Sequence, residues 1–286
     1  MYIAENWKDY ELIDTSDGER LERWGKYILI RPDPQIIWNT EKDGSWDNAH
    51  GVYRRSSKGG GSWIVSKMPD EWVIGCEDMR FAVAPMGFKH TGIFPEQKAN
   101  WDWYMPLIKN ANRPIKLLNL FAYTGCASVA AAKSGASVCH VDASKGIVAK
   151  AKHNAELSDI AEAKIRYIVD DCFKFVEREI RRGNKYDAII MDPPSYGRGT
   201  SGEVWKMEDM ADQLVAKTAL LLSDKPLFYL LNSYTTGLSA SSCAYIAGLR
   251  IAKKIGGKVE ADELGLKASK TGLYLPCGAS TRITFD

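Results

Sequence analysis

From Arg113 to the end of the chain, short apolar runs alternate with segments whose apolar residues recur every three to four positions. The apolar runs predict buried strands over 115–123, 136–144, 163–171, 186–192 and 226–234. The periodic segments between them predict helices over 126–135, 145–159, 172–183, 207–223 and 242–257. Two further strands joined by a turn are predicted over 258–269 and 272–285. Strands that alternate with helices indicate an α/β domain, with a doubly wound, mostly parallel, seven-stranded sheet covered by helices on both faces.

Residues 1–112 have a different pattern and contain eight of the nine tryptophans. Short strands broken by glycine and proline are predicted over 26–31, 51–67, 71–75 and 80–94. Segment 16–25, Ser-Asp-Gly-Glu-Arg-Leu-Glu-Arg-Trp-Gly, is the one clear helical or capped patch. We therefore expect a smaller, strand-rich N-terminal domain for substrate recognition over 1–112, and the α/β domain over 113–286.

Composition indicates an ordinary globular protein, since 45% of the 286 residues are hydrophobic and 26% are charged. The formal charge of +2 neither demands nor excludes a polyanionic partner. No apolar leader follows Met1 and no run is long enough to cross a bilayer, so we expect a cytoplasmic protein without a membrane partner. Six scattered cysteines and four isolated histidines favour reduced thiols and no metal site. Composition leaves the oligomeric state open.

Polar residues follow four successive predicted strands of the α/β domain. Segment 119–125 follows the first strand, Asp142 the second, Asp170 and Asp171 the third, and Asp192 the fourth. Each acid taken singly is also explained as a helix N-cap, but acids at successive strand ends favour a ligand-binding rim. The Thr124-Gly125 turn lets backbone approach a ligand, although no dinucleotide or Walker glycine pattern is present. A carboxylate after the second strand suits a ribose diol, which leaves nicotinamide and flavin cofactors possible.

Three segments in this order resemble a class I S-adenosylmethionine-dependent methyltransferase. They are LLNLFAYTGCASVAAAKSGASVCHVDASKGIVAKAKHNAELS, IVDDCFKFVE and YDAIIMDPPSY, at 117–158, 168–177 and 186–196. More narrowly, they resemble the RlmI-like and RlmKL-like large-subunit rRNA methyltransferases, and GIFPEQKANWDWY at 92–104 is similar to the Phe-Leu-Asp-Gln-Arg segment that precedes their catalytic fold. The resemblance runs from about Phe81 to the C-terminus and implies a Rossmann-like methyltransferase fold. It does not extend over residues 1–70, where we find no match to the PUA module of some relatives.

The resemblance implies that S-adenosylmethionine is the cofactor. The loop under its methionine part would be formed by Asn119, Phe121, Tyr123, Thr124 and Gly125. Asp142, with Ala143 beside it, would hold the ribose hydroxyls, and Asp171, Cys172 and Phe173 would contact the adenine, while Gln97 closes over the cofactor. Asn119 replaces the usual acid of the loop, and Phe121 replaces its first glycine. Both replacements occur among these rRNA enzymes.

The fourth strand runs into Asp192-Pro193-Pro194-Ser195-Tyr196. In amino-directed methyltransferases, an Asp/Asn-Pro-Pro-aromatic tetrad ends this strand beside the methyl group. The prolines fix the backbone so that carbonyls and the Asp192 carboxylate accept hydrogen bonds from a planar exocyclic amine, and Tyr196 stacks on the base. The resemblance thus implies catalytic roles for Asp192, Pro193, Pro194 and Tyr196, with Ser195 inserted before the aromatic. The alternative is a strand terminator with a solvent-facing tyrosine.

Methylation of cytosine at carbon, as in the RlmI-like branch, needs a thiolate that adds to the ring. The relatives' cysteine follows the fifth strand, where NSYTTGLS at 232–239 has none. We therefore expect transfer to a base nitrogen, with guanine favoured. The alternatives are carbon methylation, a protein or small-molecule acceptor, and a module that binds the cofactor without catalysis.

Segment 52–63 interleaves basic and aromatic residues and predicts RNA contacts by Arg54, Arg55 and Lys58. The alternative is that the charges form a solvated face and the aromatics form a core. Residues 1–112 hold 14 Lys and Arg against 17 Asp and Glu, a net charge of −3, so RNA recognition there would have to be local. The expected partner is RNA, in particular rRNA, in keeping with a role in rRNA processing.

Overall fold

The computed structural model describes residues 1–56, 60–66, 68–161, 164–198 and 204–285. The chain divides into two compact units, each assembled from distant parts of the sequence. The larger unit comprises Met1–Tyr2, Asn100–Leu264 and Gly278–Asp286, and the smaller unit comprises Ile3–Ala99 and Gly265–Cys277. The domain division at residues 112 and 113 stays a prediction.

The main sheet contains all seven predicted strands of the α/β domain. They are β9 (Lys116–Leu120), β10 (Ser137–Asp142), β11 (Ile165–Val169), β12 (Ala188–Met191), β15 (Phe228–Ser233), β16 (Lys258–Lys267) and β17 (Tyr274–Thr284). Short strand β1 (Tyr2–Ala4) adds an eighth at the edge, and the order is β1-β16-β17-β15-β12-β9-β10-β11. Strands β9 to β12 and β15 pair in parallel, while β17 runs antiparallel to β15. The predicted mostly parallel α/β fold is confirmed.

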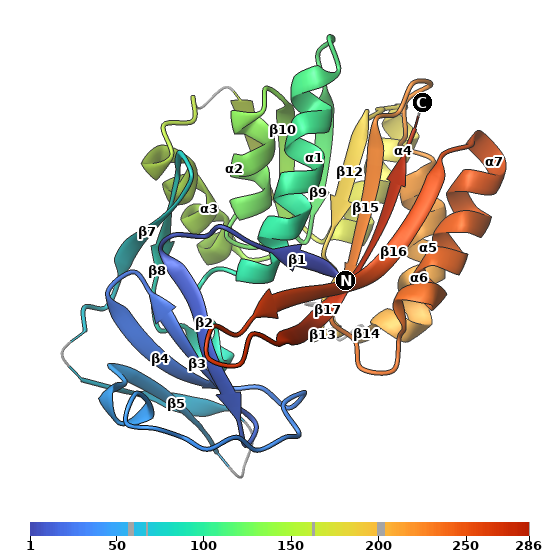
Figure 1. Cartoon of the computed structure of the whole chain (residues 1–286). Helices are drawn as coiled ribbons and strands as arrows, with labels where there is room; N and C mark the ends of the chain where they lie inside the picture. Colours follow the sequence, from blue (N-terminus) through green and yellow to red (C-terminus); the bar gives the residue numbers. More distant parts are fainter. Residues whose placement is uncertain (57–59, 67, 162–163, 199–203, 286) are drawn as a thin grey trace. The chain divides into compact units, whose positions relative to one another are not determined.

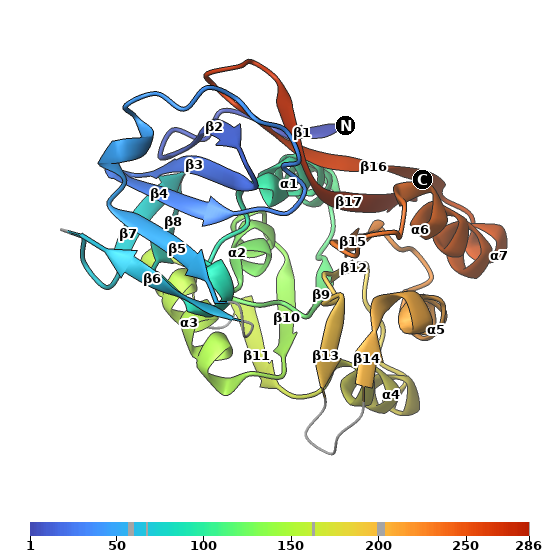
Figure 2. The ribbon, with the colours of Figure 1, turned by 90° about the horizontal axis from the view of Figure 1, so that it is seen from below.

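Helices cover both faces of this sheet. Helices α2 (Cys126–Lys133) and α3 (Lys145–Leu157) lie on one side of β9–β11, and α4 (Cys172–Arg182) and α5 (Met207–Ala219) lie on the other (Figures 1 and 2). The remaining helices are α1 (Lys98–Asn110), α6 (Ala240–Ala247), the π-helix η5 (Gly248–Ala252) and α7 (Lys253–Ile255). Leu214, Val215 and Phe175 pack with the strands in one buried apolar cluster. Among the described residues, no helix combines the length and apolar character that crossing a membrane requires.

The order of the strands determines where a ligand can bind. Strand β9 lies between β12 and β10, so the chain crosses to the other half of the sheet between β11 and β12. The carboxyl ends of β9 and β12 therefore flank the topological switch point, where open α/β sheets bind their ligands. Leu120 and Met191 are register partners there, which brings the segments that follow the two strands together.

The smaller unit is rich in strands, as predicted. A five-stranded sheet has the order β2 (Tyr10–Ser16), β3 (Glu19–Trp24), β4 (Tyr27–Pro32), β5 (Gly51–Arg55) and β6 (Gly61–Val65). Strands β7 (Trp72–Cys76) and β8 (Met79–Val83) form a separate ribbon, and the 3-10 helices are η1 (Trp46–Asn48), η2 (Gly87–Lys89) and η3 (Pro95–Gln97). Leu21, Ile30 and Trp46 form the buried cluster under the five-stranded sheet.

The helical or capped patch predicted over 16–25 was wrong. Glu19–Trp24 is strand β3, and the turn that joins it to β2 has Asp17 at φ 51° and Gly18 at φ 72°. Two consecutive residues with positive φ form the tight turn that matches the twist of a hairpin, and Asp-Gly is well suited to it. The Asp-Gly turn therefore begins a second strand here and not a helix.

This turn yields a stability prediction. Gly18→Ala places a Cβ on a backbone with φ +72°, and we expect it to lower the free energy of unfolding by ~1 kcal/mol. Urea unfolding, followed by tryptophan fluorescence, measures the change. Gly44→Ala is the matched control, since its new Cβ would have no atom within 4 Å and its φ is ordinary. Equal stability of the two variants would contradict the turn assignment.

Candidate active site

The loop between β9 and α2 has an unusual backbone. Phe121 and Tyr123 have φ values of 53° and 49°, in the left-handed region that L-residues rarely adopt. The Phe121 N–H donates to Cys172 Sγ at 3.2 Å, and the Tyr123 N–H donates to Asp142 Oδ2 at 3.0 Å. The loop is thus held by groups from the start of α4 and the end of β10.

Gly125 ends this loop, has φ 80° and precedes the first residue of α2. A Cβ at this position would lie 2.7 Å from the Cβ of Ala151 in α3, closer than packed carbon atoms approach. Asn154, also in α3, donates from Nδ2 to the Thr124 carbonyl at 2.8 Å. Glycine is therefore required because the start of α2 packs directly on α3.

Asn119 lies within β9 rather than after it, and its side chain is buried. Its Nδ2 donates to Ser128 Oγ at 2.9 Å, and that oxygen lies 3.0 Å from His140 Nδ1. Burial lowers the pKa of His140 to about 4, so the imidazole is neutral at pH 7. Asn119 thus connects β9 to α2 through Ser128. Its contact with a cofactor stays a prediction.

Asp142 is the last residue of β10, and each of its carboxylate oxygens accepts one backbone hydrogen bond. Oδ1 accepts the Ser144 N–H at 3.0 Å and Oδ2 accepts the Tyr123 N–H at 3.0 Å. A carboxylate offers about four acceptor positions, so each oxygen retains capacity for another donor. Asp142 is half-buried and Ala143 is exposed. The geometry fits a carboxylate that holds the loop and accepts two further hydroxyl groups.

The acids after β11 have structural partners. Asp171 caps α4, where its Oδ1 accepts the Lys174 N–H at 2.9 Å, and Asp170 forms an ion pair with Arg178. The N-cap interpretation thus holds for Asp171, whose side chain is nevertheless exposed at the rim. Cys172 is buried, and burial raises the pKa of its thiol. Phe173 is half-buried at the same end of the helix.

The segment after β12 begins beside β9, where the Asp192 N–H donates to the Leu120 carbonyl at 3.4 Å. Pro193 is buried, Pro194 is exposed, and Tyr196 is 52% exposed. Tyr196 begins a hairpin of β13 (Tyr196–Arg198) and β14 (Val204–Lys206), which sequence analysis did not predict.

Trp205, in β14, is a site residue that sequence analysis missed. Its Nε1–H donates to the Pro194 carbonyl at 2.6 Å. Its ring centroid lies 5.8 Å from that of Phe121 and 5.7 Å from that of Phe173. One side chain thus joins the loop after β9, the start of α4 and the proline pair. The available signal was that Trp205 is the one tryptophan outside residues 1–112.

Four other predicted site residues belong to the smaller unit. Gln97 is buried in η3, Arg54 is exposed and pairs with Glu19 at 2.7 Å, and Arg55 is exposed. Lys58 lies outside the described residues. The roles of these four residues stay predictions. Across the part of the chain that the structure describes, no group of three His, Cys, Asp or Glu is arranged to hold a metal ion.

Comparison with known proteins agrees with this geometry. A sequence profile of S-adenosylmethionine-dependent methyltransferases matches residues 38–238. The crystal structure of the SAM-dependent methyltransferase from Agrobacterium tumefaciens is 36% identical and aligns over 99% of this chain and 92% of its own, with a TM-score of 0.93. This chain belongs to the S-adenosylmethionine-dependent methyltransferase family. S-adenosylmethionine is its cofactor, and the acceptor capacity of Asp142 beside an exposed rim fits the ribose of that group.

Two curated relatives of this methyltransferase carry substrate names. Ribosomal RNA large subunit methyltransferase I of Tolumonas auensis is 33% identical over 130 residues, 45% of this chain and 32% of its own. Ribosomal RNA large subunit methyltransferase K/L of Shewanella sp. strain MR-4 is 32% identical over 135 residues, 46% of this chain and 18% of its own. The aligned part of the methyltransferase therefore spans a third or less of these relatives.

The close approach of α2 and α3 generates a binding prediction. Gly125→Ala forces α2 away from Ala151 and strains the backbone, and we expect affinity for S-adenosylmethionine to fall at least about tenfold. Isothermal titration calorimetry measures the affinity. Gly146→Ala in α3, which has no atom within 4 Å of the new Cβ, should bind like the wild type. Unchanged affinity of the Gly125 variant would refute the role of this turn.

The Trp205 hydrogen bond generates a second prediction. Trp205→Phe keeps an aromatic ring but removes the N–H, so the amides of Tyr196 and Gly197 should exchange about fivefold faster, equivalent to ~1 kcal/mol. Hydrogen exchange followed by NMR measures these amides. Trp38→Phe, which removes a 3.0 Å hydrogen bond to Thr15 Oγ1, should leave them unchanged. Equal exchange in both variants would show that Trp205 does not hold the segment.

Proposed function

We propose that this methyltransferase transfers the methyl group to a base nitrogen of ribosomal RNA, with guanine as the favoured base. The observation that carries the proposal is the position of Asp192-Pro193-Pro194-Ser195-Tyr196 at the end of β12, beside β9 at the switch point. A carboxylate, two proline carbonyls and a half-exposed aromatic ring follow this strand within five residues. That set matches the donors and the flat face of an amino-substituted base.

The residues of the rim have separable roles in holding the cofactor. When bound, S-adenosylmethionine supplies a methyl group on a positively charged sulfur. Asp142 accepts the ribose hydroxyls with the capacity that Tyr123 and Ser144 leave. The backbone of 121–125 underlies the methionine part, and Phe173 packs beside the adenine. Trp205, which contacts Phe121 and Phe173, limits the access of water to this end of the site.

The proline segment positions the acceptor nitrogen. The Pro194 carbonyl already receives the Trp205 N–H, so the Pro193 carbonyl and the Asp192 carboxylate are the acceptors that we assign to the exocyclic amine. Two hydrogen bonds to a planar amine orient its nitrogen toward the methyl group, and Asp192 holds the proton that the nitrogen releases. Tyr196, at 52% exposure, presents its ring for stacking on the base.

The cysteines favour nitrogen over carbon as the acceptor. Carbon methylation of cytosine requires a thiolate that attacks the ring, but all six cysteines are buried. Burial raises the pKa of Cys126 to about 12 and those of Cys139 and Cys243 to about 11. The pKa values of Cys172 and Cys277 are also raised by burial. These thiols stay protonated at pH 7 and are poor nucleophiles.

The relatives support rRNA as the acceptor, since both carry ribosomal RNA large subunit in their names. The experiment incubates large-subunit rRNA with the protein and S-adenosylmethionine carrying a deuterated methyl group, followed by nucleoside mass spectrometry. Labelled methylguanosine is the expected product. Labelled 5-methylcytidine would overturn nitrogen transfer, and absence of label from a protein that binds the cofactor would overturn the RNA assignment in favour of a protein or small-molecule acceptor.

Asp192 provides a prediction for the transfer step. Asp192→Ala removes an acceptor for the amine, so we expect a rate at saturating cofactor about 100-fold lower, with cofactor affinity within about twofold of the wild type. Rates of label incorporation and calorimetric titration measure the two quantities. Asp209→Ala, an exposed acid in the first turn of α5, is the matched control and should transfer normally. If Asp192→Ala transferred the methyl group at the wild-type rate, Asp192 would have no role in the transfer step.

A further inference from the structure

The loop after β8 in the smaller unit presents an aromatic ring to solvent. Phe88 and Lys89 have φ values of 56° and 68°, and the Phe88 side chain is 74% exposed. The loop is closed by backbone hydrogen bonds from Ala84 to Thr91 at 3.1 Å and from Met86 to His90 at 2.9 Å. A left-handed backbone is unfavourable for a bulky side chain, so the closed loop imposes it and turns an apolar ring outward.

The β5–β6 hairpin joins this loop. Trp63 of β6 donates from Nε1 to the Met86 carbonyl at 2.8 Å, and its ring meets that of its cross-strand partner Tyr53 at 5.6 Å. Arg55 lies two residues after Tyr53 in β5, so its side chain leaves the strand on the same face. Arg55 is therefore on the face of the hairpin that meets the Phe88 loop. Tyr53 itself is buried and belongs to the core of this face.

Most cations near this face are neutralised by acids. The ion pairs are Arg54 with Glu19 at 2.7 Å, Arg31 with Glu22 at 2.6 Å and Arg20 with Asp33 at 2.8 Å. Arg55, by contrast, forms no ion pair with any residue in the described ranges, and it is exposed.

Lys89 is the second cation of this face without a partner acid among the described residues. Its Nζ donates to the Pro32 carbonyl at 2.8 Å. Burial, together with the charges of Arg20, Arg31 and Arg55, lowers the pKa of Lys89 to about 8, against the opposing effect of Asp33. After the ion pairs cancel, Arg55 and Lys89 leave two positive charges near an exposed ring, an arrangement that attracts an anion.

We propose that Phe88, Arg55 and Lys89 form a contact site for single-stranded RNA, in which the ring stacks on a base and the two cations hold phosphates. The inference rests on the proposed function for its assumption that RNA is the acceptor. Every base has a face on which an aromatic ring stacks, and phosphate contacts explain why cations are left unpaired beside the ring. An apolar protein partner would cover Phe88 without using these charges.

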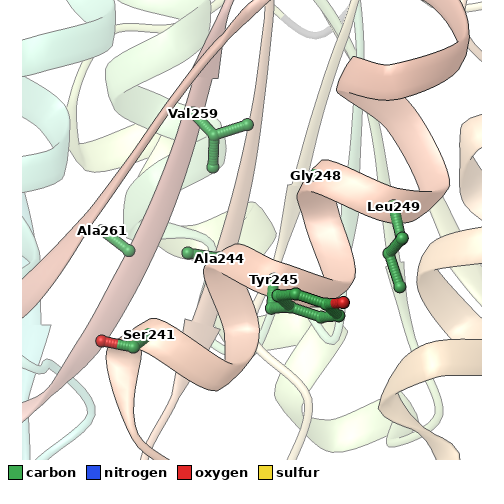
Figure 3. Close-up of a pocket in the computed structure, with 7 residues that line it drawn as sticks. All are labelled: Ser241, Ala244, Tyr245, Gly248, Leu249, Val259 and Ala261. Atoms are coloured by element: carbon green, nitrogen blue, oxygen red, sulfur yellow. The ribbon is translucent and has the colours of Figure 1, made fainter.

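A groove between α6, η5 and β16 differs from the Phe88 site in its lack of charge. Figure 3 shows this groove, with Tyr245 and Leu249 on the helical side and Val259 and Ala261 on the strand. Its lining residues include no charged side chain. It therefore lacks the cations that a phosphate requires, and we assign no RNA contact to this groove.

The test measures binding of the full chain to a fluorescein-labelled single-stranded RNA of about 12 nucleotides by fluorescence anisotropy. Phe88→Ala should weaken binding about tenfold, and Phe88→Trp should restore it because the indole also stacks. Arg55→Gln should reduce the slope of log affinity against log salt by about one, whereas Phe88→Ala should leave the slope unchanged.

Two further variants separate stacking from folding. Phe88→Gly relieves the left-handed backbone, so its thermal midpoint should equal or exceed that of the wild type while RNA affinity still falls. Ile37→Ala, which truncates a side chain of the same unit at 90% exposure, should change neither quantity. The inference would be overturned if Phe88→Ala lost RNA affinity because it unfolded, while the folded Phe88→Gly variant bound RNA like the wild type.

The outcomes distinguish this inference from the proposed function. If rRNA is methylated and Phe88→Ala alters neither its KM nor oligonucleotide affinity, the inference fails and the function stands. If the oligonucleotide binds through Phe88 but rRNA accepts no label, the inference stands and the function fails. Wild-type protein that does not bind the oligonucleotide overturns the inference, and methyl transfer is then judged by mass spectrometry alone.

Discussion

The left-handed backbone between β9 and α2 is the constraint on which the active site depends. Phe121 and Tyr123 are held in this conformation by Cys172 Sγ and Asp142 Oδ2, which accept their N–H groups. Gly125 completes the turn because nothing larger fits against Ala151. The chain can thereby pass from β9 directly into α2, which leaves the carboxyl edge of the sheet open to a cofactor. The same contacts tie the ends of three strands together, so the rim forms only when the sheet does.

Two carboxylates of the rim have structural partners and retain the capacity to accept further hydrogen bonds. Asp171 caps α4 with one oxygen, while Asp142 uses one acceptor position of each oxygen for the loop. Because a carboxylate has about four acceptor positions, being a structural cap does not prevent it from also being a ligand. These backbone hydrogen bonds also fix the orientation of both carboxylates, so in the proposed function they would be preorganised for the cofactor.

Trp205 connects this loop to the segment that follows β12. The hairpin β13–β14 returns its indole to the Pro194 carbonyl and places the ring against Phe121 and Phe173. The proline pair is thereby attached to the residues that border the cofactor rim, although more than thirty positions separate Phe173 from Trp205 in the sequence. In the smaller unit, the Phe88 loop follows the same principle, because hydrogen bonds from neighbouring backbone impose a conformation that the residue itself disfavours.

The sequence by itself determined seven strands of the main sheet and the helices that follow β9, β10, β11, β12 and β15, since their burial patterns are local and each recurs with its own period. It did not determine the β13–β14 hairpin. It also located Asp142, Asp171 and Asp192 at successive strand ends, because parallel strands align their carboxyl ends. The tertiary structure alone decided that Asn119 faces Ser128 from within β9 and that Trp205 joins three segments. The positive φ values of Phe121, Tyr123 and Phe88 likewise have no local signal. Such features arise from hydrogen bonds and packing between residues distant along the chain, and no periodicity of polar and apolar positions encodes those.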